Sequence, residues 1–78
     1  MEKLNLLLNQ IKLDNNLFVF FNEGKLDKII GNKEKTCYHF FITLKNTLPL
    51  STYIKFLGCL KNNFKDYKVG VSFKVENK

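Results

Sequence analysis

Apolar residues recur along the chain with two different periods, which divide it into predicted helices and predicted strands. Residues 2–11 carry apolar side chains at positions i, i+3, i+4 and i+7, the stripe of one helix face. The stripe consists of Leu4, Leu7, Leu8 and Ile11. A short second helix is predicted at about residues 15–22, where Asp14 is placed to cap its N-terminus and Gly24 to end it.

Alternation with a period of two predicts the strands. One strand is expected at residues 26–30, and a polar turn follows at residues 31–35. The strongest alternation in the chain lies in residues 36–45, where two sets of side chains point to opposite faces. One face carries Tyr38, Phe40, Ile42 and Leu44, and the other carries Cys37, His39, Phe41 and Thr43. Together, the two strands and the turn predict a β-hairpin.

A long helix is predicted from Pro49, whose fixed φ suits a first helical turn, to about Asn63. Gly58 lies inside this helix and indicates either close packing or a weak point. Residues 69–75 alternate again, which predicts a strand with one buried and one solvated face.

The resulting order, α–α–β–β–α–β, predicts an α+β fold built as a two-layer α/β sandwich. One face of a three-stranded, mixed sheet would pack against the helices. The helix before the last strand is long enough for a right-handed crossover between parallel strands. The order also resembles a type II KH fold, a class that clamps nucleic acid with a GxxG loop. No GxxG occurs in the sequence, so the comparison implies a truncated KH-like fold without the binding loop.

The composition narrows the class of protein. A hydrophobic fraction of 45% excludes a disordered chain, and a length of 78 residues predicts one domain over residues 1–78. The longest apolar runs are far shorter than a membrane span. Because the N-terminus lacks a secretory signal pattern, we expect a cytoplasmic protein in which Cys37 and Cys59 stay reduced as small hydrophobic residues.

The sequence assembles no enzyme active site. His39 is the only histidine, and Cys37 on the same strand face has no third group to orient the pair. The seven acidic residues are scattered, and no metal-binding or phosphate-binding motif occurs. We therefore expect no catalytic residue, no metal, no cofactor and no small-molecule substrate.

A net charge of +6 leaves nucleic-acid binding open as a function. All 13 basic residues are lysine, and the expected contacts are Lys33, Lys35, Lys45, Lys68 and Lys74. Arginine, the best bidentate reader of guanine and phosphate, is absent. A solvated basic surface, enlarged by the base composition of a genome rich in A and T, explains the same charge, and both interpretations stay open.

Several motifs occur in an order that resembles one known family. Residues 38–45 (YHFFITLK) resemble an aromatic W-H-F-x-F strand near the start of PolC, the Gram-positive type of DNA polymerase III alpha subunit. Residues 48–56 resemble its L-P-F-x-x-Y-x-x-F helix start, and residues 71–76 its closing V-S-F-T-I-E strand. Residues 21–28 and 6–11 also resemble its upstream segments. Tyr38 and Phe41 depart from the Trp and the polar residue that are usual there.

The resemblance implies a non-catalytic accessory domain at the start of a much larger DNA polymerase with 3′–5′ exonuclease activity. It also implies a KH-like module that contacts replisome proteins, among them the clamp-loader tau subunit, near the nucleoid. We expect the contact to use Phe41, Tyr53 and Phe56, because aromatic residues dominate interface hot spots. Core packing is the alternative role for all three. Binding of single-stranded or duplex DNA is the alternative function.

Overall fold

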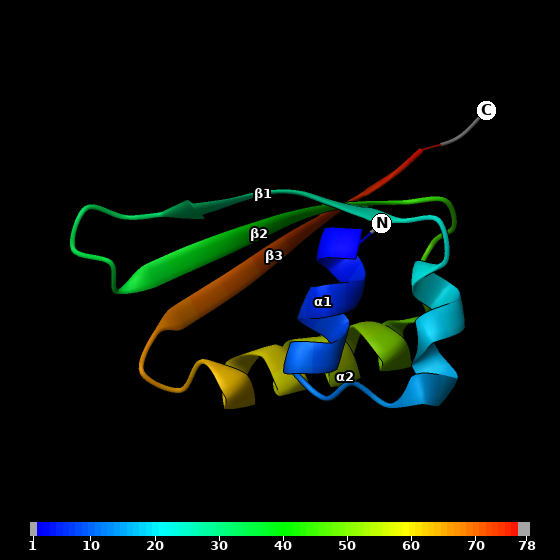
Figure 1. Cartoon of the computed structure of the whole chain (residues 1–78), viewed down its shortest axis with the longest axis horizontal. Coiled ribbons are helices and arrows are strands. Elements are labelled where there is room, and N and C mark those ends of the chain that lie inside the picture. Colours follow the sequence, from blue (N-terminus) through cyan, green and yellow to red (C-terminus); the bar gives the residue numbers. More distant parts are fainter. Residues whose placement is uncertain (1, 77–78) are drawn as a thin grey trace.

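The computed structural model describes residues 2–76, which form two layers, a three-stranded sheet and the helices packed against it (Figure 1). The elements follow in the order α1 (Glu2–Gln10), η1 (Asn15–Phe21), β1 (Lys25–Gly31), β2 (Cys37–Leu44), α2 (Leu50–Asn63) and β3 (Lys68–Val75). This order confirms the predicted α+β fold and its α–α–β–β–α–β sequence of elements. The second helix, η1, is a 3₁₀ helix.

The sheet is mixed, with the strand order β1–β2–β3. β1 and β2 form the predicted antiparallel hairpin, and β3 runs parallel to β2 after the chain has returned through α2. The parallel pairing is regular from Cys37 beside Lys68 to Leu44 beside Val75. The antiparallel pairing is interrupted between Leu26 and Lys28, where a bulge leaves Asp27 without a partner residue in β2.

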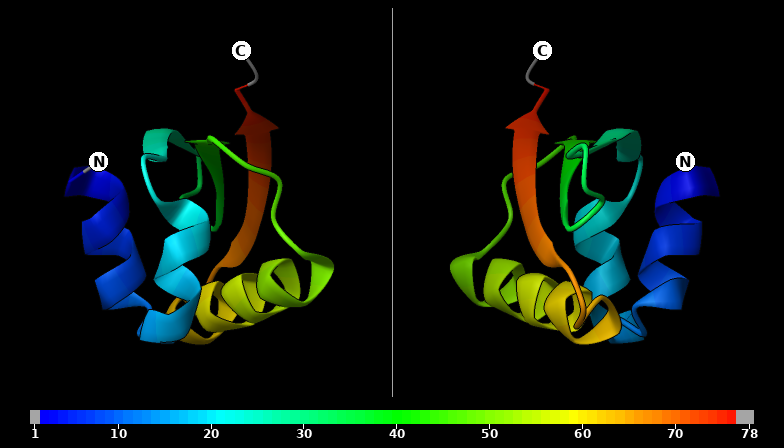
Figure 2. Two further views of the ribbon diagram at one scale, coloured as in Figure 1. Left: turned by 90° about the vertical axis from the view of Figure 1, so that its right-hand side faces the viewer. Right: turned by 90° about the vertical axis from the view of Figure 1, so that its left-hand side faces the viewer.

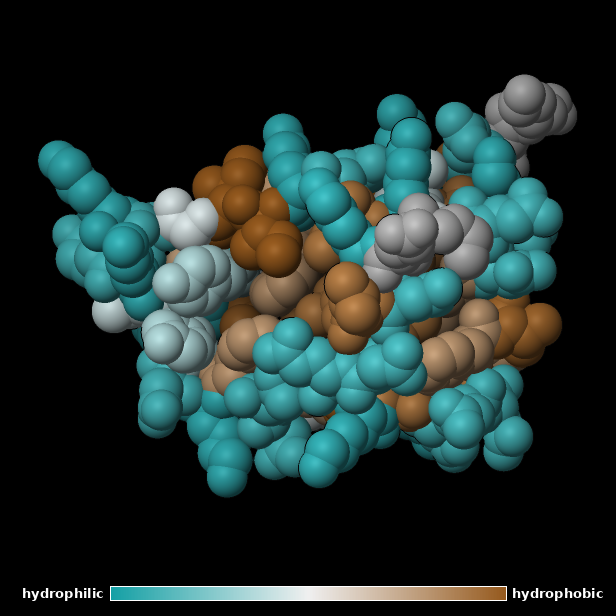
Figure 3. Space-filling model, in the orientation of Figure 1, coloured by the Kyte–Doolittle hydropathy of each residue, from teal (hydrophilic) through white to brown (hydrophobic). Residues whose placement is uncertain are grey.

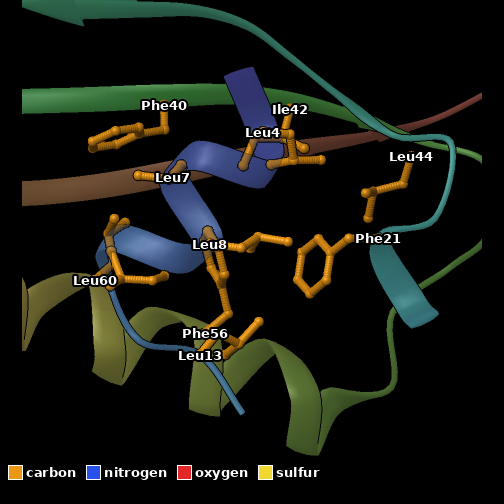
Figure 4. Close-up of a cluster of buried hydrophobic side chains, with 11 residues drawn as sticks. Leu4, Leu7, Leu8, Leu13, Phe21, Phe40, Ile42, Leu44, Phe56 and Leu60 are labelled. Atoms are coloured by element: carbon orange, nitrogen blue, oxygen red, sulfur yellow. The ribbon is translucent and has the colours of Figure 1, made fainter. Parts of the chain in front are cut away.

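The hydrophobic core lies between the sheet and the helices (Figure 4). All four residues of the predicted N-terminal stripe are buried, which confirms that pattern. From the other elements the core receives Leu13, Phe21, Phe40, Ile42, Leu44, Phe56 and Leu60. Because alternate residues of β2 point to opposite faces, the burial of Phe40, Ile42 and Leu44 fixes which face of the sheet meets the helices.

Three rings join η1, α2 and β3 at one end of this core. The ring of Phe21 lies 5.4 Å from that of Phe56 and 6.3 Å from that of Phe73, measured between centroids. Phe56 and Phe73 meet edge to face at 5.5 Å. Aromatic pairs at these separations add to the stability that area burial alone provides, so this cluster holds the 3₁₀ helix against the sheet.

The predicted ends of the second helix need two corrections. Asp14 is the N-cap residue, but its side chain makes no capping hydrogen bond. The left-handed residue after the helix is Glu23, with φ of 62°, whereas Gly24 has a negative φ. Gly24 serves packing instead: a Cβ there would lie 2.9 Å from Cδ2 of Leu44 and 3.0 Å from the carbonyl oxygens of Phe21 and Thr43.

Gly58 is the weak point of α2 rather than a site of close packing. A Cβ at this position would meet no atom within 4 Å, and the residue is exposed. No neighbour therefore requires a glycine there, and the helix carries the entropic cost of one.

Candidate functional site

Two surfaces of the domain are candidates for contact with other molecules. Figures 1 and 2 show α1, η1 and α2 on the same side of the sheet, and within residues 2–76 no helix covers its other side. We call that uncovered side the open face. It consists of Cys37, His39, Phe41 and Thr43 of β2 with their neighbours Lys28 and Ile30 of β1 and Lys68, Gly70, Ser72 and Lys74 of β3.

The second surface is a hollow of about 450 Å³ on the helix side. We call it the α2–β3 groove, and its walls include Leu48, Leu50, Tyr53, Val71, Phe73 and Val75. Two aliphatic side chains at the start of α2 project into solvent, since Leu50 is 72% exposed and Ile54, one turn farther along, is 59% exposed. Hydrophobic residues also reach the surface at several places in the view of Figure 3, among hydrophilic neighbours.

The three predicted aromatic anchors have different environments. Phe56 is 0% exposed and lies inside the core, so the prediction that it forms part of an exposed contact face is wrong. Its position in α2 points it toward Phe21 and Phe73 rather than toward solvent. Tyr53 is half-buried in the α2–β3 groove, edge to face with Phe73 at 5.8 Å. Phe41 is half-buried on the open face.

Phe41 lies at the centre of a small polar and aromatic cluster. The imidazole of His39 is 4.7 Å from its ring, and Nζ of Lys28 lies 5.0 Å from the ring centroid. Nε2 of His39 is 2.7 Å from Oγ of Ser72 on β3. The cluster therefore ties all three strands together on the open face, and His39, fixed by Ser72, supports the ring of Phe41.

The five predicted lysines do not gather at one point. Lys33 and Lys35 belong to the β1–β2 turn, which Asn32 organises by accepting hydrogen bonds from the backbone N–H groups of Thr36 and Cys37. Lys68 begins β3 beside Cys37, near the same end of the sheet, and Lys74 lies beside Thr43 near the other end.

Lys45 has an ionic partner. Its Nζ donates to Oε1 of Glu76 at 2.8 Å, between the chain after β2 and the chain after β3. This hydrogen bond, followed by the Coulomb attraction, lowers the pKa of Glu76 and raises the pKa of Lys45. Lys45 is therefore less available for an external anion than the other four lysines.

The open face also holds Asp27, the bulged residue of β1. Its Oδ2 accepts a hydrogen bond from Oγ1 of Thr43, which is buried. The hydroxyl fixes the carboxylate but does not neutralise it, so the open face carries the negative charge of Asp27 beside the positive charges of its lysines.

Chemistry-bearing residues do not converge elsewhere in the part of the chain that the structure describes. Among residues 2–76 no group of three or more His, Cys, Asp or Glu side chains could hold a metal ion. Sγ of Cys37 lies 3.8 Å from Oγ1 of Thr36, while His39 points to Ser72, so the two do not form a nucleophile–base pair. Neither α-helix in this range has the length and apolar character needed to cross a membrane.

Sequence reasoning missed two features of these surfaces. The exposure of Leu50 and Ile54 was hidden because both fit the apolar period of α2. The contact of Lys28 with Phe41 depends on the bulge at Asp27, which shifts Lys28 onto the open face. A bulge of one residue leaves no reliable mark in an alternating pattern of seven residues.

These observations define the class of protein as a small α+β domain with two surfaces open to contact and a dense aromatic core. Residues 3–75 match the family described as DNA polymerase III polC-type N-terminus I, and the chain belongs to this family. It is 37% identical to the DNA polymerase III PolC-type of Oceanobacillus iheyensis over 79 aligned residues, which cover 99% of this chain. It is 35% identical to that of Staphylococcus aureus over 97% of the chain.

The chain spans only 6% of the length of the Oceanobacillus iheyensis relative and 5% of the Staphylococcus aureus relative. The predicted resemblance to PolC is thereby confirmed for this N-terminal domain. No solved structure matches the chain, so the KH-like comparison stays a prediction.

Proposed function

We propose that this domain is a non-catalytic protein-interaction module of a PolC-type replicative DNA polymerase. In this role it contacts the clamp-loader tau subunit or another replisome protein in the cytoplasm during DNA replication. The polymerase and exonuclease chemistry belongs to other parts of the polymerase, and this domain needs no cofactor for binding.

One observation carries the proposal: two exposed aliphatic side chains at the start of α2, the first of which lines the α2–β3 groove. Leu50 is 72% exposed and lines the groove together with Phe73, and Ile54, one turn farther along α2, is 59% exposed. Burying an exposed leucine or isoleucine contributes roughly 1.5–3 kcal/mol, so a partner that covers both gains a substantial part of a micromolar affinity. Tyr53 in the same groove supplies an aromatic anchor with a hydroxyl.

The charge of the domain indicates the chemistry of the partner. The net charge is +6, and Lys55 on α2 is exposed. An apolar segment with acidic neighbours would therefore suit the groove, since complementary charges raise the rate of encounter and fix the orientation of binding.

A pull-down with the immobilised chain and purified replisome proteins tests the proposal. We expect capture of at least one of them, tau first, and its loss when Leu50→Ser and Ile54→Ser are combined. Leu6→Ser is the matched control, because Leu6 is 69% exposed on α1 and lies outside the groove. Absence of binding to every replisome protein at roughly tens of micromolar contradicts the proposal.

Nucleic-acid binding is a second candidate function, favoured by the lysines that flank the open face. Lys28, Lys68 and Lys74 are exposed there, and these three positive charges outnumber the single carboxylate of Asp27. Binding through phosphates would decrease steeply with salt. A titration with single-stranded and duplex DNA at low and high salt tests this function, and the absence of binding at low salt would remove it.

A further inference from the structure

We propose that the open face binds single-stranded nucleic acid, with a base stacked on the ring of Phe41 and the phosphates held by lysines of the outer strands. This inference rests on the second proposed function and gives it a binding mode. It commits to an unpaired strand rather than to a duplex.

The position of Phe41 is the first argument. The residue lies in the middle strand, on the side of the sheet that no helix of residues 2–76 covers, and its side chain is half-buried. His39 supports the ring at 4.7 Å and is itself fixed by Ser72. A ring that is already held by neighbours loses little conformational freedom when a base stacks on it.

The distribution of charge is the second argument. Lys28 of β1 is the register partner of Phe41, and its ammonium lies 5.0 Å from the ring. Since Lys28 is exposed, its ammonium can turn to a phosphate oxygen when a base occupies the ring face. Lys74 and Lys68 lie on the opposite outer strand, one toward each end. A strand that crosses Phe41 would thus meet a cation on either side of the stacked base.

The shape of the surface beside His39 is the third argument. The sheet is hollowed by about 420 Å³ near the hairpin, with Ile30, Gly31, Lys68 and Gly70 among the lining residues. The rings of Tyr38 and His39, which lie against Gly31 and Gly70, also line this hollow. The hollow offers room for a neighbouring nucleotide next to the cation of Lys68.

The geometry favours a single strand over the alternatives. In a duplex the bases are stacked on one another, so their faces are not free for a side-chain ring. A protein partner would find few large aliphatic side chains here, since Ile30 is the only one on the open face as defined above. Arginine is absent from the sequence, so the face is suited to phosphates and base faces rather than to the reading of base edges.

Fluorescence anisotropy with labelled oligothymidylate of about a dozen nucleotides tests the proposal, since one small domain covers roughly that length or less. The probe is titrated at two salt concentrations with the 78-residue chain and with Phe41→Leu, Phe41→Tyr and Lys28→Gln. A duplex of the same length is the comparison ligand. Tyr67→Leu and Lys61→Gln are the matched controls, because Tyr67 and Lys61 are exposed but do not belong to the open face. Circular dichroism confirms that each variant is folded.

We expect Phe41→Leu to weaken binding of the single strand about tenfold, the size of one lost stacking contact, while Phe41→Tyr and both controls keep the original affinity. Lys28→Gln should weaken binding and reduce its dependence on salt. Binding of the single strand that is unchanged in Phe41→Leu overturns this inference but leaves nucleic-acid binding intact. Absence of binding to either DNA at low salt overturns the nucleic-acid function and this inference with it.

Discussion

The imidazole of His39 lies over Gly70 of the neighbouring strand, so closely that a Cβ at position 70 would be 2.9 Å from its Nδ1. The contact results from the parallel register, which places the two residues side by side. The ring is held in this position by Ser72, whose Oγ lies 2.7 Å from Nε2. A glycine in the edge strand thus makes room for the ring that supports Phe41.

Gly70→Ala should destabilise the domain by about 1 kcal/mol, because the new methyl group displaces the imidazole and breaks its hydrogen bond to Ser72. Urea denaturation of the variant measures the loss. The decisive control is the same substitution in a His39→Ala background, where the ring is absent. If Gly70→Ala is equally costly with and without the ring of His39, the contact is not the cause.

Gly58→Ala should stabilise the domain by about 0.5–1 kcal/mol, because alanine restricts the unfolded chain and suits a helix interior. Nothing lies within 4 Å of the added Cβ, so no clash offsets the gain. The midpoint of thermal unfolding should increase. An unchanged or lower midpoint would show that α2 needs the glycine for a reason that its surroundings do not reveal.

Gly24→Ala should change the stability in the opposite direction from Gly58→Ala and lower the free energy of unfolding by about 2 kcal/mol. Here the added Cβ would meet two backbone carbonyl oxygens at 3.0 Å as well as the side chain of Leu44 at 2.9 Å. The carbonyl oxygens of Phe21 in η1 and Thr43 in β2 belong to the backbone, so they cannot move aside as a side chain can. Urea denaturation of the two alanine variants under one set of conditions compares them directly, and a neutral Gly24→Ala would contradict the packing.

Phe56→Ala should cost about 3–5 kcal/mol, because it empties the centre of the core and removes the ring contacts with Phe21 and Phe73. Tyr53→Ala, at a half-buried position of the same helix, should cost less. Equilibrium unfolding of both variants measures the difference. Equal losses would mean that Tyr53 is as much a part of the core as Phe56, which would weaken its proposed role in binding a partner.

The Lys45–Glu76 ion pair should give the domain a small stability that depends on pH and salt. Folding lowers the pKa of Glu76 below 4.5, so its contribution is complete above that pH and is lost as the pH falls through the folded value. Folding raises the pKa of Lys45 above 10.5, so the stability that the pair contributes is also lost as the pH rises through the folded pKa of Lys45. Between these limits the pair is intact. Both side chains are exposed, so salt should screen the effect.

Glu76→Gln tests this pH dependence. The difference in melting temperature between the original chain and the variant should be largest near neutral pH at low salt, and it should shrink in acid and in concentrated salt. A difference that stays constant from neutral pH into acid would mean that the pair does not contribute through its charge.

The sequence predicted the arrangement of helices and strands because the apolar residues of each element recur with a clear helical or strand spacing. The apolar residues of α1 are all buried only if the segment is a helix, and Phe40 and Ile42 are buried on one face only if theirs is a strand. Details that depend on contacts across the fold were not predictable. The positive φ fell on Glu23 rather than on Gly24 because the glycine is needed for close packing against Leu44.

The candidate site was predicted less well, for a physical reason. The helical spacing of apolar residues shows that Phe56 and Ile54 lie on a helix. Only the packing of that helix makes Phe56 0% exposed and Ile54 59% exposed. The lysine positions were read correctly as solvated. The ionic partner of Lys45 could not be predicted, since Glu76 comes close to Lys45 only through the parallel pairing of β3 with β2.

The proposed docking of a replisome protein in the α2–β3 groove is tested most directly by NMR. The backbone amide signals of the ¹⁵N-labelled chain are followed during titration with the purified tau subunit. We predict that the largest shifts occur at Leu50, Ile54, Tyr53 and Phe73, while Lys28 and Phe41 on the open face stay unchanged. Shifts confined to the open face would contradict this assignment of the groove, as would the absence of shifts with tau and with every other replisome protein at roughly tens of micromolar.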